Sequence, residues 1–225
     1  MRVIGIVPAA GYATRLQPLA CSKEVCIVQG RPVMDYVIER MNAVACEEIR
    51  IVTRPEKRDV IANAERHGAV VVTGHPNSLA DSIALALTET RDDDVALLGF
   101  PDSIWMPLDG YASLLEAMAV GYEAALGLFD AKLRQRFDAV LIDELGHVRR
   151  VEVKSERPST STFWGCAAAR SKLLRGMHGW EDPGRFLDDL AQREPIAGIW
   201  LSDSYVDVGT RQELDRLGRH EKIES

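Results

Sequence analysis

Residues 3–33 read VIGIVPAAGYATRLQPLACSKEVCIVQGRPV, and the interpretation of the whole chain starts from this stretch. An apolar run at 3–7 is followed by Pro8, small residues and Gly11, which is typical of a buried strand that enters a loop. Because this loop carries almost no side chains, its amide N–H groups can approach a large anion. Arg15 and Lys23 follow, and both side chains suit phosphate groups. The stretch indicates a triphosphate site; the alternative is a tight strand-to-helix turn with two solvated cations.

The same stretch carries a family signature. It is not a Walker A loop, because G-x-x-x-x-G-K-[ST] is absent. Instead PAAGYATRL at 8–16, SKE at 22–24 and GRPV at 30–33 resemble, in order and spacing, the motifs of the sugar-1-phosphate nucleotidyltransferases of the glucose-1-phosphate thymidylyltransferase type. Ala13 stands where that family usually has glycine, and Ile27 where it usually has proline.

The resemblance implies a set of nucleotide-site residues. Arg15 and Lys23 would be the catalytic cations. The nucleotide would be bound by the first loop and by the segment before a later helix: Ala9, Ala10, Gly11, Tyr12, Ala13, Thr14, Asn77, Ser78 and Asp81. Asp81 stands where related enzymes read the base, but its chemistry does not identify which base is bound.

Composition excludes several other classes of protein. The chain has 225 residues, 46% hydrophobic and 27% charged, as an ordinary globular protein has. A net charge of -7 gives no support to a nucleic-acid partner. No run of eighteen apolar residues occurs, so we expect no membrane partner. The four cysteines form no C-x-x-C pair, which argues against a zinc site and favours reduced thiols in the cytoplasm. A homo-oligomer is left open.

The hydrophobic pattern predicts an α/β fold. Strands and helices alternate four times in the first hundred residues, which favours a mainly parallel sheet with helices on both faces and a ligand at the carboxyl ends of the strands. The expected strands are 3–7, 48–53, 69–73 and 95–99. Short strands at 139–142, 148–153 and 162–169 predict an antiparallel extension. The final expected elements are helices at 171–180, 185–194 and 209–220, with strands at 196–201 and 205–208. We expect a single domain, 1–225, of the Rossmann-like, nucleotide-diphospho-sugar transferase type.

Two aspartates are the candidate metal ligands. Asp102 follows the predicted strand at 95–99, and carboxylates are hard ligands that suit Mg²⁺. Asp207 precedes Gly209 and Thr210, matching a D-x-G-T motif of the resembled family. In that family these two aspartates hold the catalytic magnesium. Alternatively, Asp102 is a turn residue and Asp207 caps a helix.

Four residues are candidates for the acceptor site. In the resembled family a lysine at the end of a strand grips the phosphate of the sugar phosphate, and Lys154 occupies that place. Val153 replaces the glutamate that would bind sugar hydroxyls, so Asp138 is the candidate for that contact, or else a solvated strand-end residue. Trp164 and Gly165 fall beside the acceptor in the family pattern, although Trp164 is equally suited to the core.

The predicted function is magnesium-dependent nucleotidyl transfer between an NTP and a sugar 1-phosphate, or a similar phosphorylated small molecule. One alternative is a nucleotide-binding module with little or no turnover. A less favoured one is a glycosyltransferase, which would need an Asp-x-Asp motif after a central strand, whereas 92–94 precedes the strand at 95–99.

Overall fold

A computed structural model describes residues 2–130 and 136–218, apart from the side chain of Arg15. Its centre is a set of parallel strands in the order β6-β1-β4-β5. Their bounds are β1 Val3–Pro8, β4 Glu48–Thr53, β5 Val70–Thr73 and β6 Val95–Gly99. The residues of β6 are all buried, as expected for a parallel strand covered on both faces. The predicted parallel sheet is confirmed.

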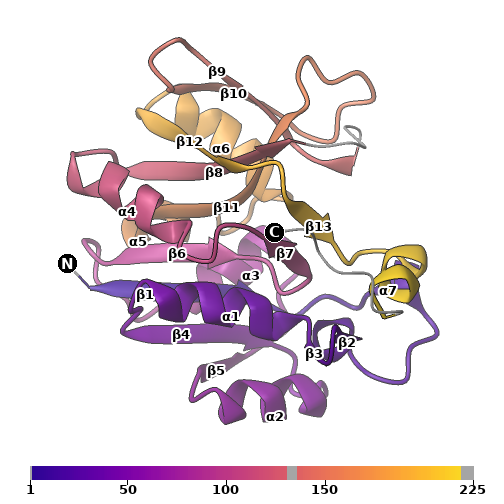
Figure 1. Cartoon of the computed structure of the whole chain (residues 1–225). Helices are drawn as coiled ribbons and strands as arrows, with labels where there is room; N and C mark the ends of the chain where they lie inside the picture. The colour runs from indigo at the N-terminus through magenta and orange to yellow at the C-terminus, as the bar shows by residue number, and fades with distance from the viewer. Residues whose placement is uncertain (1, 131–135, 219–225) are drawn as a thin grey trace.

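An antiparallel extension continues this sheet beyond β6. The long strand β11 runs antiparallel to β6 and to β8, and also touches β9. Strand β10 pairs with β9, and β12 lies parallel to β8 at the other edge. Their bounds are β8 Ala124–Asp130, β9 Ala139–Ile142, β10 Val148–Glu152, β11 Thr162–Arg170 and β12 Ile196–Ser202. Among the described residues nine strands form one mixed, twisted sheet (Figure 1).

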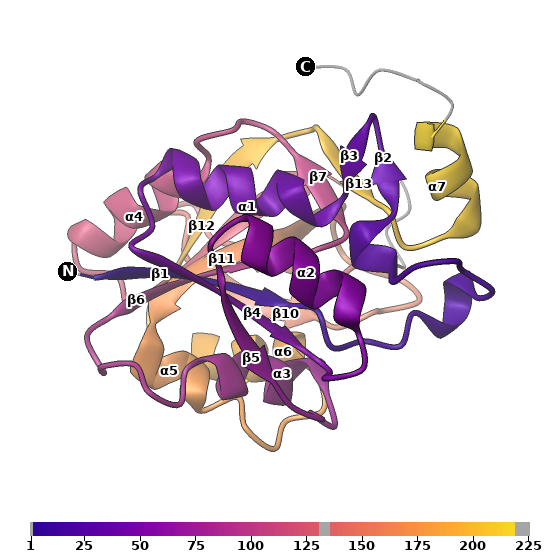
Figure 2. The same ribbon diagram turned by 90° about the horizontal axis from the view of Figure 1, so that it is seen from below.

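Helices cover both faces of the sheet (Figure 2). One face carries α1 Met34–Ala43, α2 Arg58–Arg66 and α4 Tyr111–Ala119. The other carries α3 Leu79–Ala86, α5 Ser171–Arg175 and α6 Pro183–Ala191. No helix in the described part of the chain is long and apolar enough to cross a membrane.

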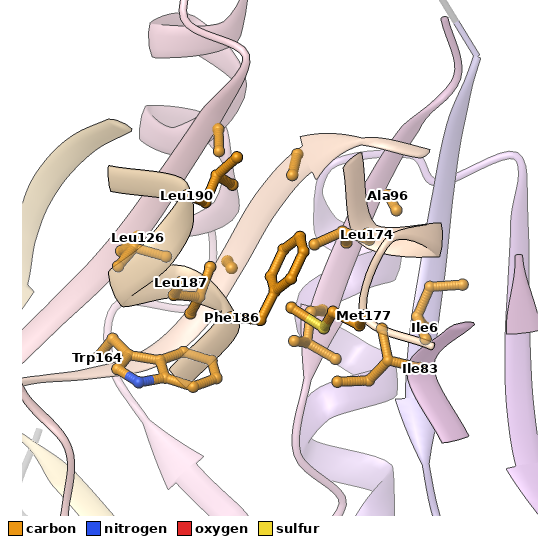
Figure 3. Close-up of a cluster of buried hydrophobic side chains, with 14 of the residues drawn as sticks. Ile6, Ile83, Ala96, Leu126, Trp164, Leu174, Met177, Phe186, Leu187 and Leu190 are labelled. Carbon is orange, nitrogen blue, oxygen red and sulfur yellow. The ribbon is translucent and has the colours of Figure 1, made fainter. Parts of the chain in front are cut away.

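Each face has its own hydrophobic core. On the face of α3, α5 and α6, Leu187 of α6 lies beside Trp164 of β11, whereas the ring of Phe186 points toward Leu174 (Figure 3). The ring of Trp164 also packs against Phe100, with centroids 5.4 Å apart. On the opposite face Trp105 is fully buried between Tyr111 and Phe129. Removing one of these aromatic side chains would cost about 3–5 kcal/mol of the free energy of unfolding.

Several short elements were not predicted, and they lie near the carboxyl ends of the parallel strands. They are the 3₁₀ turns η1 Thr14–Leu16 and η2 Lys23–Val25, and the strands β2 Ile27–Val28, β3 Arg31–Pro32 and β7 Ser103–Trp105. β7 pairs with β13 Tyr205–Asp207, and α7 Arg211–Gly218 packs near β2. The helix predicted at 171–180 is shorter than expected, because α5 ends before Gly176 and Gly179 has a left-handed φ of 83°.

Candidate active site

The carboxyl ends of the parallel strands meet at one edge of the sheet, the position where open α/β sheets bind ligands. The first loop, residues 9–13, leaves β1 at this edge. In Figure 1 the short elements β2, β3, β7, β13 and α7 lie beyond the same end of β1. Segments from the beginning, middle and end of the chain therefore meet here.

The first loop is anchored at its start and open at its middle. The N–H of Ala9 donates to the carbonyl of Val52 on the neighbouring strand at 2.7 Å. Ala9 and Ala10 are buried, whereas a Cβ added to Gly11 would meet no heavy atom within 4 Å. Packing therefore does not require glycine at position 11, and the backbone there borders open space that a ligand can enter.

Ala13 has a backbone conformation that favours glycine. Its φ of 51° and ψ of 38° are left-handed, which costs a non-glycine residue about 1–2 kcal/mol. Thr14, which follows, is exposed and begins η1. The predicted catalytic side chain of Arg15 lies outside the described part of the chain.

Lys23 lies in η2 and forms an ion pair with Asp102. Its Nζ donates to Oδ2 of Asp102 at 2.6 Å, and the two side chains are 22% and 19% exposed. Burial acts to lower the pKa of Lys23, but the carboxylate of Asp102 outweighs it and raises the pKa above its ordinary value; the charges of Glu24 and Asp207 add to this. Lys23 is therefore charged at neutral pH and coupled to both predicted aspartates.

Asp102 lies in the turn just before β7, and Asp207 ends the strand β13 that pairs with β7. Asp207 is opposite Ser103 in the antiparallel β7–β13 pair, and the N–H of Val208 donates to the carbonyl of Asp102 at 2.8 Å. Oδ2 of Asp207 is 2.8 Å from a guanidinium nitrogen of Arg136, a cation that the sequence motifs did not single out. Within the described residues no three or more His, Cys, Asp or Glu side chains form a group that could hold a metal. An ion at this pair would take its remaining ligands from substrate oxygens or water.

Sequence reasoning missed three charged residues beside the first loop. Lys57 Nζ donates to the carbonyls of Ala9 and Gly11 and to the carboxylate of Glu24, at 2.8, 3.1 and 2.7 Å. Glu24 is fully buried, and burial raises its pKa although Lys57 acts to lower it. Arg54 Nε donates to the carbonyl of Ala10 at 2.8 Å. For Arg54 and Lys57, the one sequence feature that points to this edge of the sheet is their position, because 54–57 directly follows β4, the strand next to β1.

The predicted base-reading segment is organised by its own hydrogen bonds. Ser78 caps α3 by accepting from the N–H of Asp81 at 3.0 Å, and its hydroxyl donates to the carbonyl of Trp180 at 2.8 Å. The carboxylate of Asp81 accepts from the N–H of Gly179 at 2.9 Å. Asn77 is exposed. Asp81 thus contacts the turn at 178–180, and its reading of a base stays a prediction.

The acceptor-site candidates divide into two groups. Asp138 accepts from the N–H of Lys154 at 3.1 Å, and Lys154 Nζ pairs with Asp182 at 2.6 Å. Burial and the charge of Asp182 raise the pKa of Asp138. By contrast, Trp164 is 6% exposed within the core, and a Cβ at Gly165 would come within 2.9 Å of the Phe129 ring. Packing accounts for Gly165, whereas the Trp164 side chain also adjoins Asp138 and acts to lower the pKa of that carboxyl; Asp138, Lys154 and Asp182 form a charged cluster.

Comparison with known proteins first defines the class of fold. Over 99% of this chain, the structure matches a crystal structure described as a candidate glucose-1-phosphate thymidylyltransferase from Bacillus anthracis, with a TM-score of 0.82, 19% identity and 98% of that chain covered. The architecture is therefore that of the nucleotidyltransferase fold. A family model for the MobA-like NTP transferase domain matches residues 5–172. The chain belongs to this family, and the resemblance read from its first loop is confirmed.

Two curated relatives are similar over most of this chain. The low-salt glycan biosynthesis nucleotidyltransferase of Haloferax volcanii is 27% identical over 168 residues, which cover 70% of this chain and 46% of that protein. The glucose-1-phosphate thymidylyltransferase of Neisseria meningitidis is 24% identical over 165 residues, which cover 69% and 57%. The chain thus spans about half the length of the curated relatives it matches.

Proposed function

We propose that the protein transfers a nucleotidyl group from an NTP to a sugar 1-phosphate, or to a similar phosphorylated small molecule, with magnesium as cofactor. A phosphate oxygen of the acceptor attacks the α-phosphorus, the bond between that phosphorus and the bridging oxygen breaks, and pyrophosphate leaves. The observation that supports this best is the meeting of Lys23, Asp102 and Asp207 at the strand edge beside the open first loop.

The charges available suit a reaction between two anions. Positioning and neutralisation dominate such a reaction, because a phosphate nucleophile needs no proton removed. Lys23 would hold the α-phosphate region and Arg15 the departing pyrophosphate. Lys154, 59% exposed and paired with Asp182, would exchange that partner for the acceptor phosphate.

The two aspartates fit a magnesium ion. They offer two hard carboxylate groups, one in the turn before β7 and one at the end of β13, and one or two carboxylates are what Mg²⁺ commonly takes from a protein when phosphates supply other ligands. Asp102 forms an ion pair with Lys23, and Asp207 forms one with Arg136. When the carboxylates bind the ion, these two cations would be available to bind phosphate oxygens. When bound, the ion would neutralise the phosphates and polarise the α-phosphorus.

The glycosyltransferase alternative has less support. Asp92 pairs with Arg175 and the carbonyl of Asp93 accepts from Arg170, at the end of β6 opposite to Lys23. The acidic residues 92–94 therefore lie away from the candidate active site.

A nucleotide-binding module without turnover would keep the same site residues, so only an assay separates it from an enzyme. The test is pyrophosphate release from the purified chain with Mg²⁺, each of ATP, GTP, CTP, UTP and dTTP, and a panel of sugar 1-phosphates. Release that requires one NTP, one acceptor and Mg²⁺ supports the proposal. NTP binding without release contradicts it and favours the module, and sugar transfer from an NDP-sugar favours the glycosyltransferase.

A further inference from the structure

Two cationic side chains bind the carbonyl groups of the first loop. Lys57 binds the carbonyl oxygens of Ala9 and Gly11, at 2.8 and 3.1 Å, and Arg54 binds that of Ala10 at 2.8 Å. Three consecutive carbonyls are thus fixed by two cations, both from the segment that follows β4.

Fixing these carbonyls also fixes the direction of the N–H groups that follow them. The two cis peptide bonds of the described chain lie elsewhere, at 17–18 and 106–107, so the peptide bonds of this loop are trans. In a trans peptide the carbonyl and the following N–H point in opposite directions. The N–H groups of Ala10 and Tyr12 therefore point away from Lys57, and that of Gly11 points away from Arg54. The N–H groups of Ala10 and Tyr12 thus share one orientation, and backbone N–H groups that face the same way bind anions.

Lys57 has no donor left with which to bind a ligand directly. An ammonium group has three hydrogens, and Lys57 has three acceptors: the carbonyls of Ala9 and Gly11 and the carboxylate of Glu24. Glu24 is fully buried beside Lys23, so it fixes Lys57 and connects the loop to that lysine along the chain. A phosphate-binding lysine would instead keep donors free.

Arg54 extends the same support to the predicted base-reading side. Its guanidinium lies over the ring of Tyr12, 4.0 Å from the centroid, and bonds to His75 Nδ1 at 3.0 Å and to the carbonyl of Pro76 at 3.3 Å. Arg54 thus joins the first loop to the segment that leads into α3.

We propose that Lys57 and Arg54 are positioning residues that fix the peptide groups of the first loop, so that the N–H groups of Ala10 and Tyr12 face the NTP phosphates, and that neither cation touches the nucleotide. This rests on the proposed function only in that the anion is an NTP. A misplacement of about 1 Å costs on the order of 10² in rate, so losing the support should weaken NTP binding without removing a contact.

The test uses a charge-neutral replacement of the buried pair. Lys57→Met alone would leave Glu24 buried without its cation, which is strongly destabilising. The double variant Glu24→Gln/Lys57→Met keeps the net charge, and Lys172→Met, which removes a half-exposed lysine paired with Glu123, is the control. We expect the double variant to bind the preferred Mg·NTP about 10–100-fold more weakly by calorimetry. Its KM for the acceptor should stay within threefold, and the salt dependence of NTP binding should not change.

Amide hydrogen exchange gives a readout that does not need activity. Exchange at residues 9–13 should accelerate at least tenfold in the double variant, while exchange in β1 and β6 stays as in the parent protein. Unchanged exchange in the loop, unchanged NTP affinity, or a reduced salt dependence that indicates a direct charge contact would each overturn the proposal. If the parent protein binds NTPs but releases no pyrophosphate, the proposed function fails and the positioning role is still tested by affinity and exchange. If it binds none of the five NTPs, both proposals fail.

Discussion

Replacing Lys23 by methionine separates a catalytic cation from a structural one, because the stability it contributes and the rate it supplies differ in size. Lys23 and Asp102 form an ion pair at 2.6 Å with side chains about one-fifth exposed. Exposed pairs contribute about 0–1 kcal/mol, and breaking a fully buried pair costs about 3–5 kcal/mol. This intermediate pair should therefore contribute about 1–2 kcal/mol to the free energy of unfolding. For a chain of this size, that lowers Tm by about 2–8 °C.

The expected loss of rate is larger. Removing one preorganised cation costs on the order of 10²–10³ in turnover, or about 2.7–4 kcal/mol of transition-state stabilisation. Because the pKa of Lys23 is raised in the folded protein, the stability it contributes is fully present at neutral pH and is lost only as the pH rises through that raised value. Assays near pH 7.5 therefore compare a charged lysine with no charge.

The assay is pyrophosphate release at saturating Mg·NTP, with thermal unfolding followed by circular dichroism. Lys172→Met is the matched control, since Lys172 pairs with Glu123 at 3.0 Å and is half exposed. It should retain full turnover. A folded Lys23→Met variant with kcat/KM within tenfold of the parent protein would refute the assigned role of Lys23.

Three further predictions follow from other side chains. Asp207→Asn should raise the magnesium concentration for half-maximal rate at least tenfold, and an unchanged magnesium titration would remove Asp207 from the metal site. Burial raises the pKa of Cys26 and of Cys46 to about 12. At pH 8 we therefore expect the partly exposed Cys21 to react first with a thiol reagent, as measured by mass spectrometry. Equal labelling of these three cysteines in the folded protein would contradict the burial argument. Because the pKa of Asp138 is raised in the folded protein, the free energy of unfolding falls as the pH rises through that pKa. The Asp138→Asn variant should therefore unfold at an equal or higher Tm than the parent protein at pH 8, with a smaller difference toward pH 4, and its KM for the acceptor should increase. A lower Tm of the variant at pH 8 would contradict the raised pKa.

The buried strands could be predicted closely because their patterns are local. The bounds expected for β4 and β6, 48–53 and 95–99, are those of the structure. β7 could not be predicted in the same way. Among the described residues its partner strand is β13, about a hundred positions later, so no local pattern marks it. Likewise, α5 ends earlier than its apolar residues suggested because turns at Gly176 and Gly179 follow it.

The same distinction, between residues that a sequence motif marks and residues that only the fold brings together, applies to the candidate site. Lys23, Asp102 and Asp207 could be named because they belong to a recognisable motif and have chemistry of their own. Arg54 and Lys57 could not, because they bind backbone carbonyls, a task that leaves no pattern of residue types. Glu24 offered a weaker signal: it is a carboxylate that becomes fully buried, and such a group requires a cation nearby.

The pairing of β7 with β13 has a consequence for biosynthesis. The family match ends at residue 172, yet Asp207 and the strand that lies against Ser103–Trp105 come later. A nascent polypeptide that has reached only residue 172 would carry the first loop, Lys23 and Asp102, but it would lack α6, β12 and β13 and with them the second carboxylate. The second carboxylate would therefore join the first only after α6, β12 and β13 had been added to the sheet.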